Sequence, residues 1–264
     1  RGVIRGGSDI RTDVDFEPAK GAPNNLYLLR GDIRLSEYES LLATAYNQAA
    51  AGQAIGYFQT SAIDRFLRTM GMSKDVDIFV IDTSPTLGLL NRVILLGVDY
   101  FVVPLAPDAL SLQGIENLGK IYSQWKENWH NTGQALAGDI ESKNVLSGDG
   151  LFIGYILNEY NVYGQQPIRD HRRWIEQIPG MVKKYLSERH CRNGLVAKSS
   201  EKSLMDIQDY GRLPSLAQEY GCAIFNVDPV KAEAMQLGTR NNIQKANEEF
   251  DKLADNILDV LAEY

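Results

Sequence analysis

The feature that most constrains the fold is an almost wholly apolar run, Val76–Ile81, that leads directly into Asp82. A run of this composition is expected for a strand of a parallel sheet that is covered on both faces. Two similar runs follow at 100–105 and 151–157, and segments with helical periodicity separate the three runs. Strands that alternate with helices predict an α/β fold, with a doubly wound, mostly parallel sheet and helices on both faces.

The rest of the chain adds helices, short strands and loops to this plan. Apolar residues recur at helical spacing in 36–50, 63–70, 87–96, 112–129 and 241–262. The pattern also predicts a strand at 26–29, a long basic helix at 168–190 that breaks at Pro179-Gly180, and a short strand or turn at 223–225. Residues 1–25 and 131–149 have loop composition. We expect a single domain over 1–264.

Composition excludes several classes of protein. No apolar run approaches the roughly 20 residues that a membrane-spanning helix needs. Cys191 and Cys222 have neither metal-ligand spacing nor the density of a disulfide scaffold, which predicts reduced thiols in a cytoplasmic protein. The net charge of −7 argues against a molecule that is basic throughout, although basic residues crowd the stretch 169–202.

Asp82 is the main candidate for chemistry. Ligands of open α/β sheets bind beyond the carboxyl ends of the strands, so an aspartate at this position can hold a Mg²⁺-bound water during phosphoryl transfer. Asp or Thr at such a position can equally cap the helix that comes next. The two interpretations stay open on this residue alone.

The neighbouring residues add a family resemblance. The segment IDTSPTLG at 81–88 resembles the Asp-Thr-Pro-Pro-Ser-Leu-Gly stretch of ParA-type partition ATPases. PLAP at 104–107 followed by LSLQG at 110–114 resembles the segment after the next strand in that family, and NLYLL at 25–29 with Asp32 and Leu35-Ser36 resembles the strand and loop before it. The resemblance continues weakly to the C-terminus, and it implies a P-loop NTPase-like fold.

The resemblance also implies roles for individual residues. Asp82 aligns with the Walker B aspartate that helps to position Mg²⁺, and the loop after it aligns with switch II, which senses the γ-phosphate of ATP. The nucleotide-binding residues implied in this way are Thr83, Ser84, Pro85 and Gly88. Asn158, at the end of the predicted strand 151–157, resembles an asparagine that contacts the adenine edge, where an amide offers a donor and an acceptor. Its alternative is a turn-forming asparagine after a strand.

The sequence departs from the family in one important respect. A phosphate-binding loop needs G-x-x-x-x-G-K-S/T, and the only Gly-Lys pair, Gly119-Lys120, lies in a predicted helix without the upstream glycine. The family's next strand, with switch I, is missing as well, and a single Pro85, preceded by Ser84, stands where the motif has two prolines. Either residues before Arg1 supply these parts, or the chain is a nucleotide-independent relative. We expect ATP hydrolysis in the complete protein and none by this chain alone.

The resemblance finally implies partners. ParA-type proteins form ATP-dependent dimers that bind DNA nonspecifically, and a ParB-like partner stimulates hydrolysis, so we expect the same here, in the cytoplasm and on the nucleoid. The candidate DNA-binding residues are Arg169, Arg172, Arg173, Lys183, Lys184 and Arg189; a solvated basic surface is the alternative. Two other interpretations remain: a scaffold with a ParA-like fold, and a MinD-like positioning ATPase. The acidic polar face of the terminal helix counts against membrane attachment.

Overall fold

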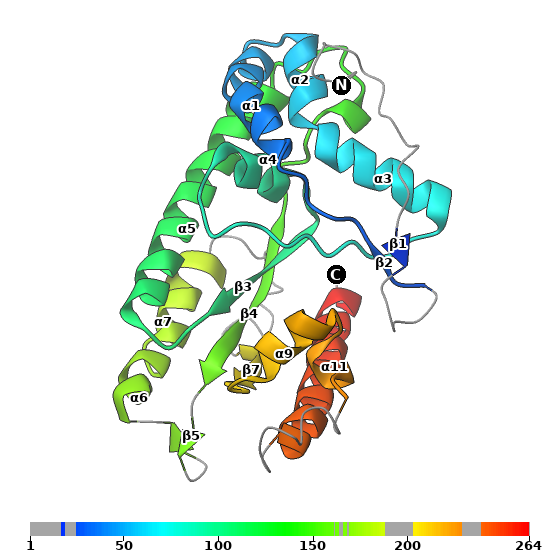
Figure 1. Ribbon diagram of the computed structural model, residues 1–264. Helices are drawn as coiled ribbons and strands as arrows, with labels where there is room; N and C mark the ends of the chain where they lie inside the picture. The colour runs from blue at the N-terminus through cyan, green and yellow to red at the C-terminus, as the bar shows by residue number, and fades with distance from the viewer. Residues whose placement is uncertain are drawn as a thin grey trace. The chain divides into compact units, whose positions relative to one another are not determined.

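The computed structural model describes residues 17–18, 25–160, 162–163, 166–167, 169–187, 203–228 and 239–263 (Figure 1). Its helices are α1 Leu35–Ala50, α2 Ala54–Thr60, α3 Ala62–Lys74, α4 Leu89–Gly97, α5 Ala109–Asn128, α6 Arg169–Ile175, α7 Ile178–Val182, α9 Leu213–Tyr220 and α11 Thr239–Ala262. Its strands are β1 Glu17–Pro18, β2 Tyr27–Leu28, β3 Tyr100–Leu105, β4 Leu151–Tyr160, β5 Val162–Tyr163, β6 Gln166–Pro167 and β7 Ser203–Gln208.

The strands β3, β4 and β7 form a three-stranded sheet in the order β3-β4-β7. β4 and β7 pair in parallel, with Tyr155 opposite Ser203 and Leu157 opposite Asp206. The register shifts between Tyr155 and Ile156, where the Ser203 hydroxyl accepts a hydrogen bond from the Leu157 N–H at 3.3 Å. The remaining strands form two small antiparallel pairs, β1 with β2 and β5 with β6. The predicted α/β fold with a parallel sheet is confirmed.

The described residues divide into two compact units. One contains Leu29–Phe101 and Asn117–Leu151, and the other contains Phe16–Leu28, Val102–Glu116 and the residues from Phe152 onward. The boundary cuts through β3 and α5, so it does not follow the ends of elements. The prediction of a single domain stays a prediction.

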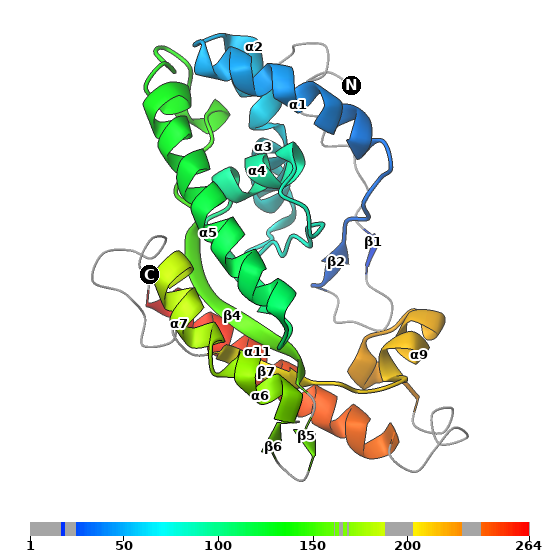
Figure 2. The same cartoon turned by 90° about the vertical axis from the view of Figure 1, so that its left-hand side faces the viewer.

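In the second unit, helices cover both faces of the β4–β7 pair. Tyr155 and Leu157 of β4 line a hollow together with Ile178 of α7. Ile156 points to the other face and packs against the core beneath α9 and α11. Figures 1 and 2 show α7 and α11 on opposite sides of this pair. The two-residue repeat of a strand therefore gives each face of β4 its own covering helix.

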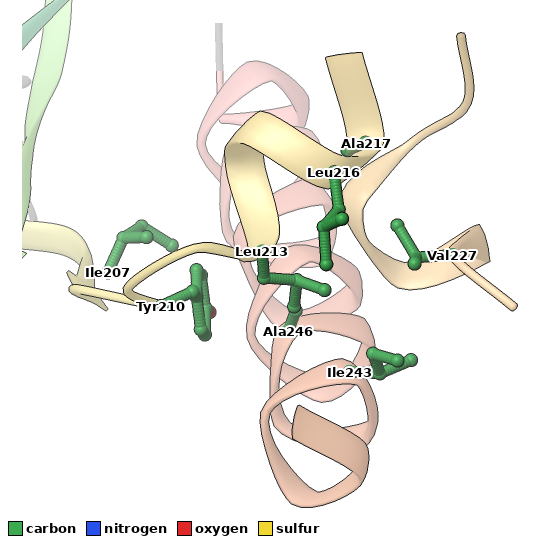
Figure 3. Close-up of a cluster of buried hydrophobic side chains, with 8 residues drawn as sticks. All are labelled: Ile207, Tyr210, Leu213, Leu216, Ala217, Val227, Ile243 and Ala246. Atoms are coloured by element: carbon green, nitrogen blue, oxygen red, sulfur yellow. The ribbon is translucent and has the colours of Figure 1, made fainter. Parts of the chain in front are cut away.

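The core on the α11 face is a cluster of eight buried side chains, which Figure 3 shows. They are Ile207, Tyr210, Leu213, Leu216, Ala217, Val227, Ile243 and Ala246. The Asn256 side chain of α11 also donates a hydrogen bond to the Leu204 carbonyl of β7 at 2.6 Å. Full burial of one large aliphatic side chain stabilises a fold by about 1.5–3 kcal/mol, so this cluster accounts for the docking of α11 on β7.

The first unit has an aromatic core whose polar atoms are satisfied by backbone carbonyls. The Trp129 indole N–H donates to the Leu146 carbonyl at 2.8 Å, and the Tyr57 hydroxyl donates to the Gly133 carbonyl at 2.6 Å. Both side chains are fully buried. Large aromatic side chains that keep a hydrogen-bond partner can fill a core without leaving an orphan donor.

One predicted strand is wrong. Residues 76–84 form no regular secondary structure, and Ile78 and Val80 are 53% and 92% exposed. Within the described ranges no strand pairs with this segment, so its backbone joins no ladder. An apolar run without a neighbouring strand cannot become one.

Most other elements follow the sequence pattern. The five predicted amphipathic helices appear as α1, α3, α4, α5 and α11, and the strands predicted at 26–29, 100–105 and 151–157 appear as β2, β3 and β4. The basic segment forms α6, α7 and a π-helical turn over Lys183–Ser187, and the chain breaks at Glu176-Gln177 rather than at Pro179-Gly180. Residues 224–226 form a 3₁₀ turn, and β7 was not predicted.

The stretch predicted as a loop at 131–149 is largely irregular, although it begins in a π-helical turn over Trp129–Gln134 and contains a 3₁₀ turn over Ser142–Asn144. In the predicted loop 1–25, β1 is a short strand, and residues 1–16 and 19–24 lie outside the described residues. Every helix in the described ranges is too short or too polar to cross a bilayer.

Candidate active site

Asp82 lies in the irregular segment 76–84, and it is exposed. The turn residues next to it, Thr83, Ser84 and Pro85, are exposed as well. Because the predicted strand before Asp82 does not form, no sheet holds this residue in place. The loop from Asp82 to Gly88 is instead shaped by its contacts with the first helices of the unit.

The strongest of these contacts comes from Asn91, in the first turn and a half of α4. Its side-chain amide donates to the Ser84 carbonyl at 2.6 Å and to the Thr86 carbonyl at 2.5 Å. Asn91 is only 6% exposed, so both bonds form away from water. A hydrogen bond in the loop, between the hydroxyls of Ser84 and Thr86 at 3.0 Å, closes the same turn. One buried amide thus fixes two peptide groups of the loop.

The N-terminus of α4 is capped from another helix. Gly88 is the N-cap residue and has no side chain to offer, so no cap bond comes from the helix itself. Instead the half-buried Glu39 carboxylate of α1 lies 3.4 Å from the Leu90 N–H. A negative charge is favourable at this end of a helix, because the first N–H groups are unpaired and the helix dipole is positive there.

Gly88 makes room for that carboxylate. A Cβ at this position would lie 2.8 Å from the Glu39 Oε1 atom, which is closer than real Cβ atoms come. The predicted nucleotide-binding role of Gly88 stays a prediction, and the close approach of Glu39 gives a structural reason for glycine here.

Behind α4, an arginine is held between two rings. The Arg92 guanidinium carbon lies 3.6 Å from the ring centre of Tyr46 on α1 and 5.6 Å from the ring of Trp125 on α5. Burial lowers the pKa of Arg92 below its usual range, and the interaction with the Tyr46 hydroxyl acts in the opposite direction. Cation–π contacts of this kind stabilise a partly buried cation by about 0.5–2 kcal/mol. α4 is thus anchored to α1 at both Glu39 and Tyr46.

Asn158 lies in the other unit, on β4. The strand continues to Tyr160, so Asn158 does not follow the strand's end, and its alternative interpretation as a turn residue is wrong. Its side chain is half-buried. The adenine-binding role stays a prediction.

The basic residues also lie in the second unit. The side chains of Arg172, Arg173, Lys183 and Lys184 are exposed, and the first two belong to α6. Arg169 is in α6 too, and Arg189 lies outside the described residues. The Arg173 guanidinium lies 5.1 Å from the Trp174 ring centre, and the Lys184 amine lies 4.7 Å from that of Tyr185. The exposed members of this set can be reached from solvent.

The loop has oxygen donors suited to magnesium. No group of three or more His, Cys, Asp or Glu side chains gathers in the described parts of the chain. Mg²⁺ bound with a nucleotide needs only one or two carboxylates, because waters and phosphate oxygens complete its shell. Asp82 and the hydroxyls of Thr83 and Ser84 fit that requirement, whereas the sequence holds no phosphate-binding loop.

Comparison with known protein families finds a match to the first half of the chain. Residues 15–134 match the model of a family described as AAA domain. The resemblance to ParA-type ATPases that Asp82 and its neighbours carry is therefore confirmed. The matched segment includes the whole loop, the Asn91 amide that holds it and the Glu39 carboxylate.

One solved structure extends the comparison beyond the matched segment. The crystal structure of protein DIP2308 from Corynebacterium diphtheriae superposes with a TM-score of 0.66 at 18% sequence identity, over 98% of this chain and 73% of that one. At this identity the likeness concerns the fold. No curated protein matches the sequence.

Sequence reasoning missed Asn91 and Glu39. A signal for Asn91 was present, because it is a lone amide inside the apolar helix Leu89–Gly97, one residue after two leucines. A buried amide in such a helix must find partners, and the nearest carbonyls are those of the preceding loop. Glu39 gave no such signal, since an acidic residue in an amphipathic helix usually faces water.

Proposed function

We propose that this chain belongs to an ATP-hydrolysing, ParA-like protein that acts in plasmid or chromosome partition. The observation that carries the proposal is the exposed Asp82 followed by a hydroxyl-rich loop that Asn91 clamps to α4, all within the segment that matches the AAA domain model. An AAA domain of this kind generally uses ATP and Mg²⁺.

The residues of the loop have different roles in the proposed ATP hydrolysis. Mg²⁺, when bound with ATP, neutralises charge on the transferring phosphoryl group. Asp82 accepts hydrogen bonds from water in the metal's shell and so orients that shell. Thr83 and Ser84 offer hydroxyls to phosphate oxygens. The rest of the loop follows the presence or absence of the γ-phosphate, and Asn158 binds the adenine edge.

The test of this function is the turnover of the full-length natural protein. Asp82→Ala should lower Mg²⁺-dependent ATP hydrolysis by at least about 100-fold, which corresponds to roughly 2.7 kcal/mol of barrier. The matched control is Asp77→Ala, because Asp77 is an exposed aspartate on the same segment. Turnover of the Asp82 variant within threefold of the parent would show that Asp82 has no such role.

We extend the proposal to DNA. An ATP-dependent dimer would bind DNA through the exposed cations Arg172, Arg173, Lys183 and Lys184, together with Arg169 and Arg189, and a ParB-like partner would stimulate hydrolysis. Contacts to phosphates carry no base information, so binding should be nonspecific and should weaken with salt.

The DNA test uses the ATP-bound full-length protein. A double change, Lys183→Ala with Lys184→Ala, should reduce the slope of log affinity against log salt by about 1.8, since each lost contact contributes about 0.9 on duplex DNA. A matched control changes two exposed lysines elsewhere, Lys74→Ala with Lys252→Ala. An unchanged slope for the first pair would mean that these cations form only a solvated surface.

A further inference from the structure

We infer that Asn91 is a positioning residue for the Asp82–Gly88 loop: its buried amide holds the loop in the arrangement that hydrolysis requires, without itself touching the nucleotide. The catalytic part of this inference rests on the proposed function. The restraint on the loop does not, and it can be measured separately.

The side-chain amide of Asn91 donates hydrogen bonds to the loop. Asn91 has two N–H donors and directs them to the carbonyls of Ser84 and Thr86, at 2.6 and 2.5 Å. The two carbonyls flank Pro85 and Thr86 in the centre of the loop. Pro85 has no backbone N–H, so the centre of the loop has one donor fewer than another residue would give it. The side chain of Asn91 supplies two donors to the carbonyls on either side.

The helix beneath the amide is fixed as well. Glu39 holds the first turn of α4 through the Leu90 N–H, and Arg92 is stacked on Tyr46. Both contacts reach α1, at positions 39 and 46, which are two turns apart on one face of that helix. The Asn91 amide therefore projects from a helix that two contacts hold against α1. Because the helix is held, the amide determines where the loop lies.

The loop itself has few other restraints among the described contacts. Its residues from Asp82 to Leu87 are exposed, whereas Asn91 is 6% exposed. Loss of this buried donor leaves the Ser84 and Thr86 carbonyls without their partner. The change destabilises the loop arrangement that Asn91 holds more than it destabilises the fold. Removal of the amide should thus free the loop locally.

The experiment compares the full-length natural protein with Asn91→Ala and Asn91→Asp. The second variant keeps the volume of the side chain and replaces the donor by an acceptor, so it tests the donor itself if Asn91→Ala fails to fold. The matched control is Asn144→Ala, because Asn144 belongs to the same unit and is also 6% exposed. The first readout is the rate of chymotryptic cleavage after Leu87, which mass spectrometry identifies, and the second is kcat together with the Kd for ATP·Mg²⁺.

Both Asn91 variants should be cleaved after Leu87 at least fivefold faster than the parent, and Asn144→Ala should not. Their kcat should fall at least tenfold while the Kd for ATP·Mg²⁺ stays within threefold, since Asn91 acts on the loop and not on the ligand. Cleavage at the parental rate in Asn91→Asp would overturn the restraint. A loosened loop with unchanged kcat, or an equal loss in the Asn144 variant, would overturn the positioning role. A parent without turnover would overturn the proposed function, and the cleavage rates would still decide the restraint.

Discussion

Two apolar runs of similar composition adopt different structures in this chain. In β4, Phe152 and Ile153 are 0% and 3% exposed, and the strand pairs with β3 on one side and β7 on the other. In the run Val76–Ile81, Ile78 and Val80 are 53% and 92% exposed, and the residues have no regular structure. Both runs have the apolar composition expected of a buried parallel strand, yet only β4 pairs with other strands.

The difference shows that a buried strand depends on partners as much as on side chains. A strand interior must pair its N–H and C=O groups before apolar burial becomes favourable, because unpaired backbone groups lose water without replacement. β4 meets this condition, and Val76–Ile81 does not within the described residues. The run therefore has the composition of a buried strand but forms an irregular, partly exposed segment in this structure.

The largest predicted effect is on the free energy of unfolding, when an isoleucine is replaced by alanine in each of the two runs. Ile153→Ala in β4 should lower the free energy of unfolding by about 2–5 kcal/mol, because it opens a cavity in a packed core. Ile78→Ala in the exposed run should change it by no more than about 0.5 kcal/mol. Urea unfolding of both variants of this chain gives the two values. Equal losses would mean that both runs are buried in solution.

A smaller effect is predicted at two glycines, one within the β4 run and one packed against the run Val76–Ile81. Gly154 of β4 has φ +149°, and an added Cβ would lie 2.7 Å from buried Leu204, so Gly154→Ala should destabilise the fold by about 1–3 kcal/mol. A Cβ at Gly71 of α3 would lie 3.2 Å from the Phe79 ring and 3.4 Å from the Val76 carbonyl, both in the exposed run. Gly71→Ala should be neutral or stabilising by up to about 1 kcal/mol, since Phe79 can move and alanine favours a helix.

Thermal or urea unfolding of the two glycine variants measures both changes. Gly114→Ala is the control, because α5 has open space at that position and the change reports helix propensity alone. A loss at Gly71 as large as that at Gly154 would show that the segment with Phe79 is as firmly packed as β7.

The smallest effect is a pH dependence that reports the burial of β4. Burial first, and then the charge of Asp206, raise the pKa of Tyr155 from 10.0 to about 12. The folded protein keeps the phenol proton at a pH where the unfolded chain loses it, so stability falls as pH rises from about 10 towards 12. Tyr155→Phe should remove about 1 kcal/mol of that loss by pH 11.

Urea unfolding at pH 9, 10 and 11 measures the difference between parent and variant. Tyr220→Phe serves as the control, because Tyr220 is 41% exposed. Identical pH dependence in the parent and Tyr155→Phe would indicate that β4 is open to water at this position.

Helices, whose backbone hydrogen bonds lie within the element, were predictable from sequence. Strands, whose backbone hydrogen bonds need a partner distant in sequence, were less so. Helices α1 and α11 carry their own hydrogen bonds and show their buried face as a 3.6-residue repeat. The run 76–81 misled because composition does not reveal whether a neighbouring strand exists. β7 was missed because Asp206 and Ser203 interrupt its apolar pattern, and these residues sit at the register shift and the hollow beside β4.

The candidate site also contains features that local sequence predicts and features that it does not. The position of Asp82 at the start of a turn and the hydroxyls around it could be inferred from local sequence. The Asn91 amide and the Glu39 carboxylate could not be assigned, since their partners are set by the packing of α4 against the loop and against α1.

The Arg92 stack behind α4 gives the protein an optical consequence. The guanidinium lies over Tyr46 of α1 and within 5.6 Å of the ring centre of Trp125 of α5. A cation at an indole face alters its excited state, so the emission of Trp125 depends on where α4 places Arg92. Because α4 also carries Asn91, any displacement of the loop that moves this helix changes the intrinsic fluorescence of the protein. The molecule thus has a built-in fluorophore at the base of the loop, and Trp129→Phe combined with Trp174→Phe would leave Trp125 as the single tryptophan emitter.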